Sequence, residues 1–291
     1  MREDILSLLD GQAHTFSKGQ RRIAVFIKES YDKAAFMTAS KLGKAVNVSE
    51  STVVRFAMEL GYDGYPSMQK AMQEMVMNRL TSVQRIGVAN DRIGDHDVVK
   101  TVLQSDIEKL RQSAELVDRE NFQKAVDVIL KARRIYVIGV RSAAMLANFM
   151  GYYLNYMFDN VHVITASGGS EMFEKLVGVR SDDAVLAFSF PRYSTATVNA
   201  AQYCRQVGAA VIGLTNSVMS PLAQHCDHLL LAKSDMLSLV DSLVAPLSVV
   251  NALLVALAAG RKTVLAENFD RLERVWEEYH VYEKRNDNAD F

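Results

Sequence analysis

Cysteine is nearly absent from this sequence of 291 residues, which holds only Cys204 and Cys226. The two do not form a CxxC pair, and no histidine stands at a spacing typical of a zinc site. This argues against a disulfide framework and a structural metal, and we expect no cofactor. So few cysteines also fit a reducing compartment, and we therefore expect a cytoplasmic protein.

The chain also has almost no net charge, with 33 Lys and Arg against 34 Asp and Glu. Its isoelectric point is near 6.6, so the chain as a whole is not an evident polyanion binder. The charges are distributed unevenly, because residues 1–80 hold 11 basic and 9 acidic side chains. The N-terminal part is thus mildly basic, which weakly favours contact with nucleic acid there.

A long uninterrupted apolar run is missing too. The most apolar stretch, Leu243 to Ala259, is broken by Pro246, Ser248 and Asn251. A membrane-spanning helix needs about 20 apolar residues, so we interpret this stretch as a buried helix. The charged residues 2–4 precede only a short apolar patch, which is not the pattern of a signal peptide. We expect no membrane partner.

Residues 1–80 carry the patterns of short, capped helices. A capping box at Ser17 precedes one helical stretch, and Thr38 can cap a second, short helix. Ser49 can cap a third helix that runs to Leu60. Two short helices joined by a tight turn predict a helix-turn-helix.

The third of these helices has two faces. One face is apolar at helical spacing, with Val53, Phe56, Ala57 and Leu60. The other carries short polar residues and an arginine, which suits a helix that must lie deep in a major groove about 12 Å wide. The predicted DNA-binding residues are Ser49, Ser51, Thr52 and Arg55. The alternative is a small helical bundle that contacts no nucleic acid.

Residues 81–97 show little periodicity and predict a linker, and residues 98–291 predict a second domain. Two helical stretches open this domain, and strands then alternate with helices, which implies a parallel sheet covered on both faces. The predicted strands are 135–138, 161–165, 184–188, 210–214 and 228–231. Ligands in such folds bind beyond the carboxyl ends of the strands. The turns at 139–142 and 189–194 are therefore expected at one edge of the sheet.

The stretch from Ala184 to Asn199 reads as a buried strand, a polar turn and the start of a helix. The first turn of a helix has unpaired N–H groups and a partial positive charge, so it suits an anion. Ser189, Arg192 and Ser194 add hydroxyl and guanidinium donors to this turn. A phosphate-sized ligand is one interpretation, and the other is that Ser194 simply caps the helix.

Several of these motifs together resemble the RpiR/MurR-type transcriptional regulators, in which a helix-turn-helix is joined to a SIS (sugar isomerase) domain. The matching segments are VSESTVVRFAMELGYDGY at 48–65, IGVRS at 138–142, FSFPRYS at 188–194 and SPLA at 220–223. The resemblance implies an all-α helix-turn-helix domain followed by a doubly wound, parallel-sheet α/β domain. It further implies a DNA-binding regulator of carbohydrate metabolism that senses a phosphorylated sugar.

The resemblance also implies where the phosphate binds. SIS domains typically hold it with S-x-S-x-x-[ST] after the third strand and G-x-G-x-S after the first. Ser189 and Ser194 keep the outer positions of the former, whose middle serine is Pro191 here; in the latter, Gly139 is kept and Ala143 replaces the serine. The implied phosphosugar-binding residues are Arg141, Ser142, Ser189, Arg192 and Ser194, with the two arginines supplying charge.

A sugar-phosphate isomerase is the main alternative, and it needs a carboxylate base beside the sugar carbonyl. Glu171 is the best-placed carboxylate, but a glutamate at a helix N-terminus is ordinarily there to stabilise the helix. An isomerase does not need a recognition helix, so we expect a regulator without catalytic activity. Because helix-turn-helix proteins usually recognise pseudo-palindromes, we also expect a homodimer or homotetramer. Leu239–Ala259 is a candidate for part of the contact, although burial within one domain explains this apolar stretch equally well.

Overall fold

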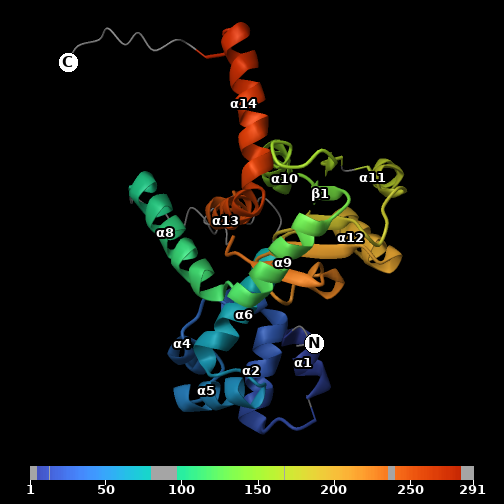
Figure 1. Ribbon diagram of the computed structural model, residues 1–291. Helices are drawn as coiled ribbons and strands as arrows, with labels where there is room; N and C mark the ends of the chain where they lie inside the picture. Colours follow the sequence, from blue (N-terminus) through green and yellow to red (C-terminus); the bar gives the residue numbers. More distant parts are fainter. Residues whose placement is uncertain (1–4, 13, 80–96, 167, 235–239, 283–291) are drawn as a thin grey trace, which may run out of the picture. The chain divides into compact units, whose positions relative to one another are not determined.

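A computed structural model of the protein describes residues 5–12, 14–79, 97–166, 168–234 and 240–282 (Figure 1). The chain divides into two compact units, the first helical and the second α/β, and each is described by itself. The predicted linker at 81–97 lies outside the described residues except for Asp97. That residue caps the first helix of the second unit, because its side chain accepts a hydrogen bond from the Lys100 N–H.

The first unit consists of six described helices. They are α1 (Ile5–Gly11), α2 (Lys18–Glu29), α3 (Tyr31–Ala34), α4 (Ala39–Ala45), α5 (Glu50–Glu59) and α6 (Tyr65–Arg79). The predicted caps are confirmed: Ser17 forms a capping box with Gln20, and Thr38 and Ser49 accept hydrogen bonds at the starts of α4 and α5. Sequence analysis did not anticipate the short helices α1 and α3.

The pair α4 and α5 forms the helix-turn-helix. The predicted apolar face of α5 is confirmed, since Val53, Phe56, Ala57 and Leu60 are all buried. The turn is tight, with Asn47 in the left-handed region at φ 55°. A Cβ on Gly43 of α4 would lie 2.8 Å from the carbonyl oxygen of Val48, so only glycine fits this close approach.

The second unit is built on a five-stranded parallel sheet in the order β2-β1-β3-β4-β5. The strands are β1 (Ile135–Gly139), β2 (Val161–Ile164), β3 (Ala184–Phe188), β4 (Ala210–Thr215) and β5 (His228–Leu231). The helices are α8 (Val98–Leu116), α9 (Arg119–Lys131), α10 (Ala143–Leu154), α11 (Gly169–Leu176), α12 (Thr195–Val207), α13 (Val244–Gly260) and α14 (Lys262–Glu278). The predicted fold class is confirmed.

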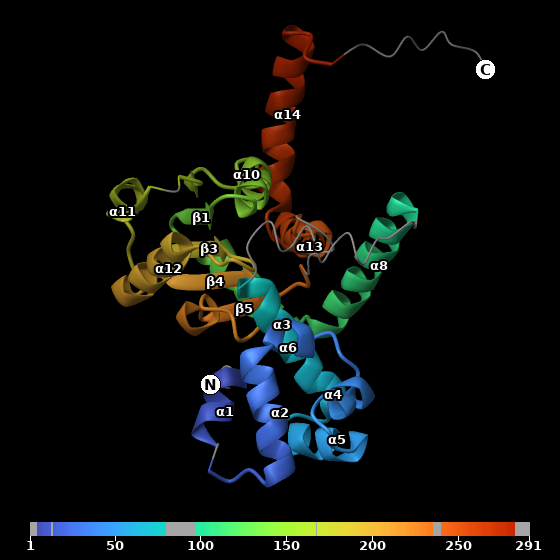
Figure 2. The ribbon, with the colours of Figure 1, turned by 180° about the vertical axis from the view of Figure 1, so that it is seen from behind.

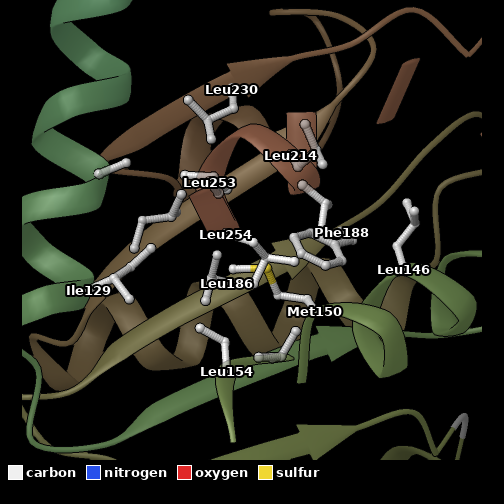
Figure 3. Close-up of a cluster of buried hydrophobic side chains, with 14 of the residues drawn as sticks. Ile129, Leu146, Met150, Leu154, Leu186, Phe188, Leu214, Leu230, Leu253 and Leu254 are labelled. Carbon is white, nitrogen blue, oxygen red and sulfur yellow. The ribbon is translucent and has the colours of Figure 1, made fainter. Parts of the chain in front are cut away.

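Helices cover both faces of this sheet (Figure 2). On one face, α9, α10 and α13 bury the larger apolar cluster, in which residues such as Met150, Leu186 and Leu253 meet (Figure 3). On the other face, α11 and α12 bury the smaller one. The apolar stretch beginning at Leu243 is thus a core helix, as its interruptions predicted.

In the described part of the chain, no single helix has both the length and the apolar composition required to cross a membrane. Helices α13 and α14 satisfy that requirement only as a pair, and they are bent by 96° at their junction. Beyond this bend, α14 extends away from the sheet and its covering helices (Figures 1 and 2).

Candidate functional site

Three hydroxyl side chains gather at the N-terminus of α5. Ser49 caps the helix by accepting from the Thr52 N–H at 3.2 Å. Its Oγ also lies 2.8 Å from both Ser51 Oγ and Thr52 Oγ1. Ser49 and Ser51 are exposed and Thr52 is partly exposed, so the structure brings these predicted residues together on an accessible helix end. These hydroxyls are therefore hydrogen-bonded to one another in the absence of a ligand.

Arg55 lies one turn further along α5 and is exposed, where its guanidinium can reach a partner. Glu59, on the same polar face, instead accepts a hydrogen bond from the Gln20 side chain of α2. This contact fixes α5 against α2. The end of the polar face therefore takes part in packing within the unit, whereas the residues at its start are exposed.

Sequence analysis missed a shallow depression of about 500 Å³ beside this helix-turn-helix. Its wall combines one side of α2 with the end of α4 and the turn, namely Arg21, Arg22, Val25, Phe26, Glu29, Ala45, Val46 and Asn47. The two arginines place positive charge beside the turn that precedes α5. Such charge is typical of contacts with the phosphate backbone.

The carboxyl ends of β1 and β3 lie side by side. Gly139 pairs with Phe188 in the parallel register, so the turns that follow both strands start at the same edge of the sheet. A Cβ on Gly139 would lie 2.6 Å from the Ala143 carbonyl oxygen, which explains why the turn into α10 needs glycine. The predicted residues Arg141, Ser142 and Arg192 are all exposed on these turns.

Both arginines at this edge adopt left-handed backbone conformations, with φ 59° at Arg141 and 63° at Arg192. Non-glycine residues rarely adopt this conformation, and it recurs at ligand-binding turns. Each of the two turns that sequence analysis assigned to the ligand therefore holds one arginine in an uncommon conformation.

Four hydroxyl side chains on the segments after β3 and at or after the end of β4 are buried, with Thr197 in the first turn of α12. Ser189 is 2% exposed, Thr197 and Thr215 are 0% and Ser220 is 4%. Within the described structure, none of these hydroxyl oxygens has a hydrogen-bond partner. A buried hydroxyl without a partner costs about 1–3 kcal/mol, so the group favours an incoming polar ligand or water.

Of these four residues, sequence analysis identified only Ser189. The register brings Thr215 beside it, because the Ser189 N–H donates to the Leu214 carbonyl at 3.2 Å. Ser220 begins the SPLA motif, which was noted for its resemblance alone. Thr197 occupies an inner position of α12, where an apolar residue is the usual choice.

The N-terminus of α12 completes this edge. Ser194 stands at the N-cap position, but its hydroxyl makes no capping hydrogen bond in the described structure. Nearby, the Tyr193 hydroxyl donates to Asn216 Oδ1 at 2.8 Å and so joins the turn after β3 to the turn after β4. The N-terminus of α12 thus lacks a side-chain cap, and the turns at this edge of the sheet carry buried hydroxyls and two exposed arginines.

Comparison with known proteins decides the family. The model of the helix-turn-helix domain of the rpiR family matches residues 3–79, and the SIS domain model matches residues 128–256. The sugar isomerase domain of the RpiR transcription factor from Sphaerobacter thermophilus is 30% identical, with a TM-score of 0.59, over 61% of this chain and 98% of that one. This chain belongs to the RpiR family.

As an RpiR-family protein, it is a transcriptional regulator with a helix-turn-helix and a SIS domain. The HTH-type transcriptional regulator HexR of Pseudomonas aeruginosa is 23% identical over 224 residues, 76% of each chain. The NanR protein of Vibrio vulnificus, solved in complex with ManNAc-6P, shares the fold with a TM-score of 0.58 and 22% identity over 93% of this chain and 97% of that one. The resemblance inferred from the motifs is confirmed.

Glu171, the best-placed carboxylate for the isomerase alternative, has an exposed side chain. Glu171, in the first turn of α11, forms an exposed ion pair with Lys175 at 2.9 Å.

Burial raises the pKa of both Cys204 and Cys226 to about 12, so these thiols stay neutral at physiological pH. Among the described residues, no cluster of histidine, cysteine and carboxylate side chains is suited to a metal ion.

Proposed function

We propose that this RpiR-family regulator binds operator DNA through α5 and binds a phosphorylated sugar at the carboxyl edge of its sheet, and that the sugar changes operator affinity. The observation that carries the proposal is the set of buried hydroxyls, those of Ser189, Thr197, Thr215 and Ser220, that have no hydrogen-bond partner in the described structure. Phosphate oxygens are strong acceptors and match such donors. The NanR complex with ManNAc-6P supports the same ligand class.

The phosphate group is proposed to lie at the N-terminus of α12. Backbone N–H groups and the helix dipole favour an anion there, and Ser189 and Ser194 donate their hydroxyls to its oxygens. Arg141 and Arg192 approach from the two flanking turns and supply charge. Ser142 on the turn after β1 completes the proposed phosphosugar-binding set.

The DNA contact is proposed to centre on the N-terminus of α5. Ser49, Ser51 and Thr52 are short enough for the helix to approach the bases closely, and Arg55 can bind a guanine edge or a phosphate. Two copies of the chain are needed to contact the two half-sites of an operator, about 34–36 Å apart for adjacent turns. We propose a homodimer or homotetramer for this reason.

The sugar is proposed to act as an effector and not as a substrate. It binds between the turns at 139–142 and 189–194, and it favours whichever arrangement of the paired SIS domains binds it more tightly. A coupling of about 1–3 kcal/mol is typical of allosteric proteins, and it corresponds to a change of roughly 5- to 150-fold in operator affinity. Glu171 carries no catalytic role in this proposal.

The test combines calorimetry with operator binding. Hexose and pentose phosphates are titrated into the full-length protein, each beside the matching unphosphorylated sugar, and an operator selected from random DNA is then titrated with and without the bound effector. We expect binding of at least one phosphosugar, no binding of its unphosphorylated counterpart, and a shift in operator affinity. Equal binding of both sugars, or turnover of a phosphosugar that is lost in Glu171→Gln, would contradict the proposal.

A further inference from the structure

Helix α14 is 17 residues long, yet none of its side chains is buried in the described structure. It leaves the core after the 96° bend and contacts its own unit mainly through its N-terminal half, where Asn268 donates to the Tyr156 carbonyl at 2.8 Å. Six side chains of α14 are half-buried and the others are exposed. The helix therefore gains less from its own unit than a helix with a fully buried face, because most helical stability in proteins comes from packing. The C-terminal half of α14 therefore lacks a partner within the described chain.

The composition of α14 is that of a packing surface. Its apolar side chains recur at spacings of three and four, namely Leu265, Phe269, Leu272, Val275, Trp276 and, just beyond the helix, Tyr279. Aromatic rings form a continuous ladder, with centroids 5.2 Å apart for Tyr156 and Phe269, 6.4 Å for Phe269 and Trp276, and 5.2 Å for Trp276 and Tyr282. Trp276 is the only tryptophan of the chain, and tryptophan is enriched at the energetic centres of interfaces.

The charges of α14 are reversed relative to its dipole. The helix begins with Lys262 and ends with Glu277 and Glu278, with no acidic residue in the first turn and no basic residue in the last. Isolated helices prefer the opposite arrangement, so this pattern weakens α14 on its own. A neighbouring helix that runs antiparallel would place its acidic end against Lys262 and its basic end against the two glutamates.

We infer that α14 packs antiparallel against α14 of a second copy of this chain, about a two-fold axis. In this orientation Lys262 of each helix meets Glu277 and Glu278 of the other, and the partly exposed apolar side chains of the C-terminal half gain a covering surface. The stretch Leu239–Ala259, named above as a candidate for part of the contact, fits less well, since α13 buries Val249, Leu253 and Leu257 within its own unit. The inference goes beyond the proposed function, and its test requires neither DNA nor effector.

The test measures the dimer dissociation constant of the full-length protein by sedimentation. Trp276→Ala is expected to raise this constant about 30-fold or more, as for a central interface residue. Glu277→Lys with Glu278→Lys is expected to raise it about tenfold, and so is Lys262→Glu. Combining all three charge reversals restores opposite charges across the axis, so the triple variant should return to within about threefold of the original.

Lys262→Glu separates this inference from a simple folding defect. An acidic residue at the helix start favours the isolated helix, so the variant should keep or gain helical content while it loses dimer affinity. Dilution of the unaltered protein should also shift the Trp276 emission to longer wavelength as the ring becomes exposed to water. Val177→Ala is the control, because it removes an exposed apolar side chain from the end of α11 and should leave the dimer intact.

Three results would each overturn the inference. The first is a protein that stays monomeric at tens of micromolar. The second is a dimer whose affinity is unchanged by Trp276→Ala and by the charge reversals, because its contact then lies elsewhere. The third is a triple variant that is weaker than either partial reversal, because the like charges then do not face each other across the pair.

Discussion

Both units contain groups of serine and threonine hydroxyls, but the two groups differ in their hydrogen bonding. At the start of α5, the hydroxyls of Ser49, Ser51 and Thr52 lie near the surface and are bonded to one another. At the carboxyl ends of β3 and β4, the hydroxyls of Ser189 and Thr215 are buried and have no partner within the described structure. The first group is satisfied before any ligand binds, whereas the second leaves hydrogen-bonding capacity unused.

This difference has an energetic consequence. A ligand at the sheet edge gains from each unpartnered hydroxyl, because the cost of leaving that group unbonded disappears on binding. DNA at α5 must exchange existing hydrogen bonds and water for its own contacts, so each hydroxyl there contributes less. We therefore expect single hydroxyl deletions to be severe for the effector and mild for the operator.

The largest effect is expected for Ser189→Ala. Loss of a hydroxyl bonded to a charged phosphate should weaken phosphosugar binding by about 1.5–3 kcal/mol, or roughly 10- to 150-fold. The free energy of unfolding of the unliganded protein should not fall, because the hydroxyl has no partner to lose. Calorimetry and denaturant unfolding measure the two quantities, with Ser248→Ala as the control, since that hydroxyl bonds only within α13. A loss of stability without a loss of binding would reverse the comparison.

Arg55→Ala is expected to have the next largest effect, and on the other ligand. Removal of a guanidinium that binds a base or phosphate should weaken operator binding by about 1–3 kcal/mol while phosphosugar binding stays unchanged. Fluorescence anisotropy with the selected operator measures this loss. Lys124→Ala is the matched control, because it removes one positive charge from the exposed surface of α9. Equal losses in both variants would reduce the role of Arg55 to general charge.

The two N-cap serines provide the most direct comparison. Ser49→Ala should lower the free energy of unfolding by about 1 kcal/mol, because its side chain caps α5. Ser194→Ala should change it by less than about 0.5 kcal/mol, because that hydroxyl caps nothing, yet it should weaken phosphosugar binding. Denaturant unfolding of both variants checks this prediction, and equal losses of stability would show that Ser194 is an ordinary cap.

The smallest effect at neutral pH concerns the thiols. Burial raises the pKa of Cys204 and Cys226 from 9 to about 12, so both should resist a thiol reagent at pH 8 in the folded protein. The folded pKa lies above the unfolded one, so the contribution to stability is complete below about pH 9 and is lost as the pH rises towards 12. Unfolding curves at pH 7, 8.5 and 10 measure this loss, and fast thiol reaction at pH 8 would contradict the burial.

Much of this architecture follows from local patterns. The bounds of β3 and β5 were predicted to the residue, because short apolar runs between polar turns leave little choice of register. The caps at Ser17, Thr38 and Ser49 were predicted because capping depends only on residues three positions apart. The family was recognised from motifs of the same local kind.

Local patterns could not predict the features that form only when segments distant in the sequence come together in the fold. Thr197, Thr215 and Ser220 come from a helix, a strand end and a loop, and only the fold buries all three. The left-handed conformations of Arg141 and Arg192 could not be predicted, because neither residue is a glycine or asparagine, the residue types that usually adopt them. The short helices α1 and α3 lack the length over which periodicity becomes visible.

The close approach at Gly43 has a consequence for genetic variants of this protein. Any side chain at this position collides with the Val48 carbonyl and displaces the turn that aims α5, while the second unit is untouched. Alleles with a substitution at Gly43 should therefore yield subunits that still pair and still bind effector but cannot hold an operator. In a cell that also carries the normal copy, such subunits would form mixed pairs and act as dominant-negative alleles.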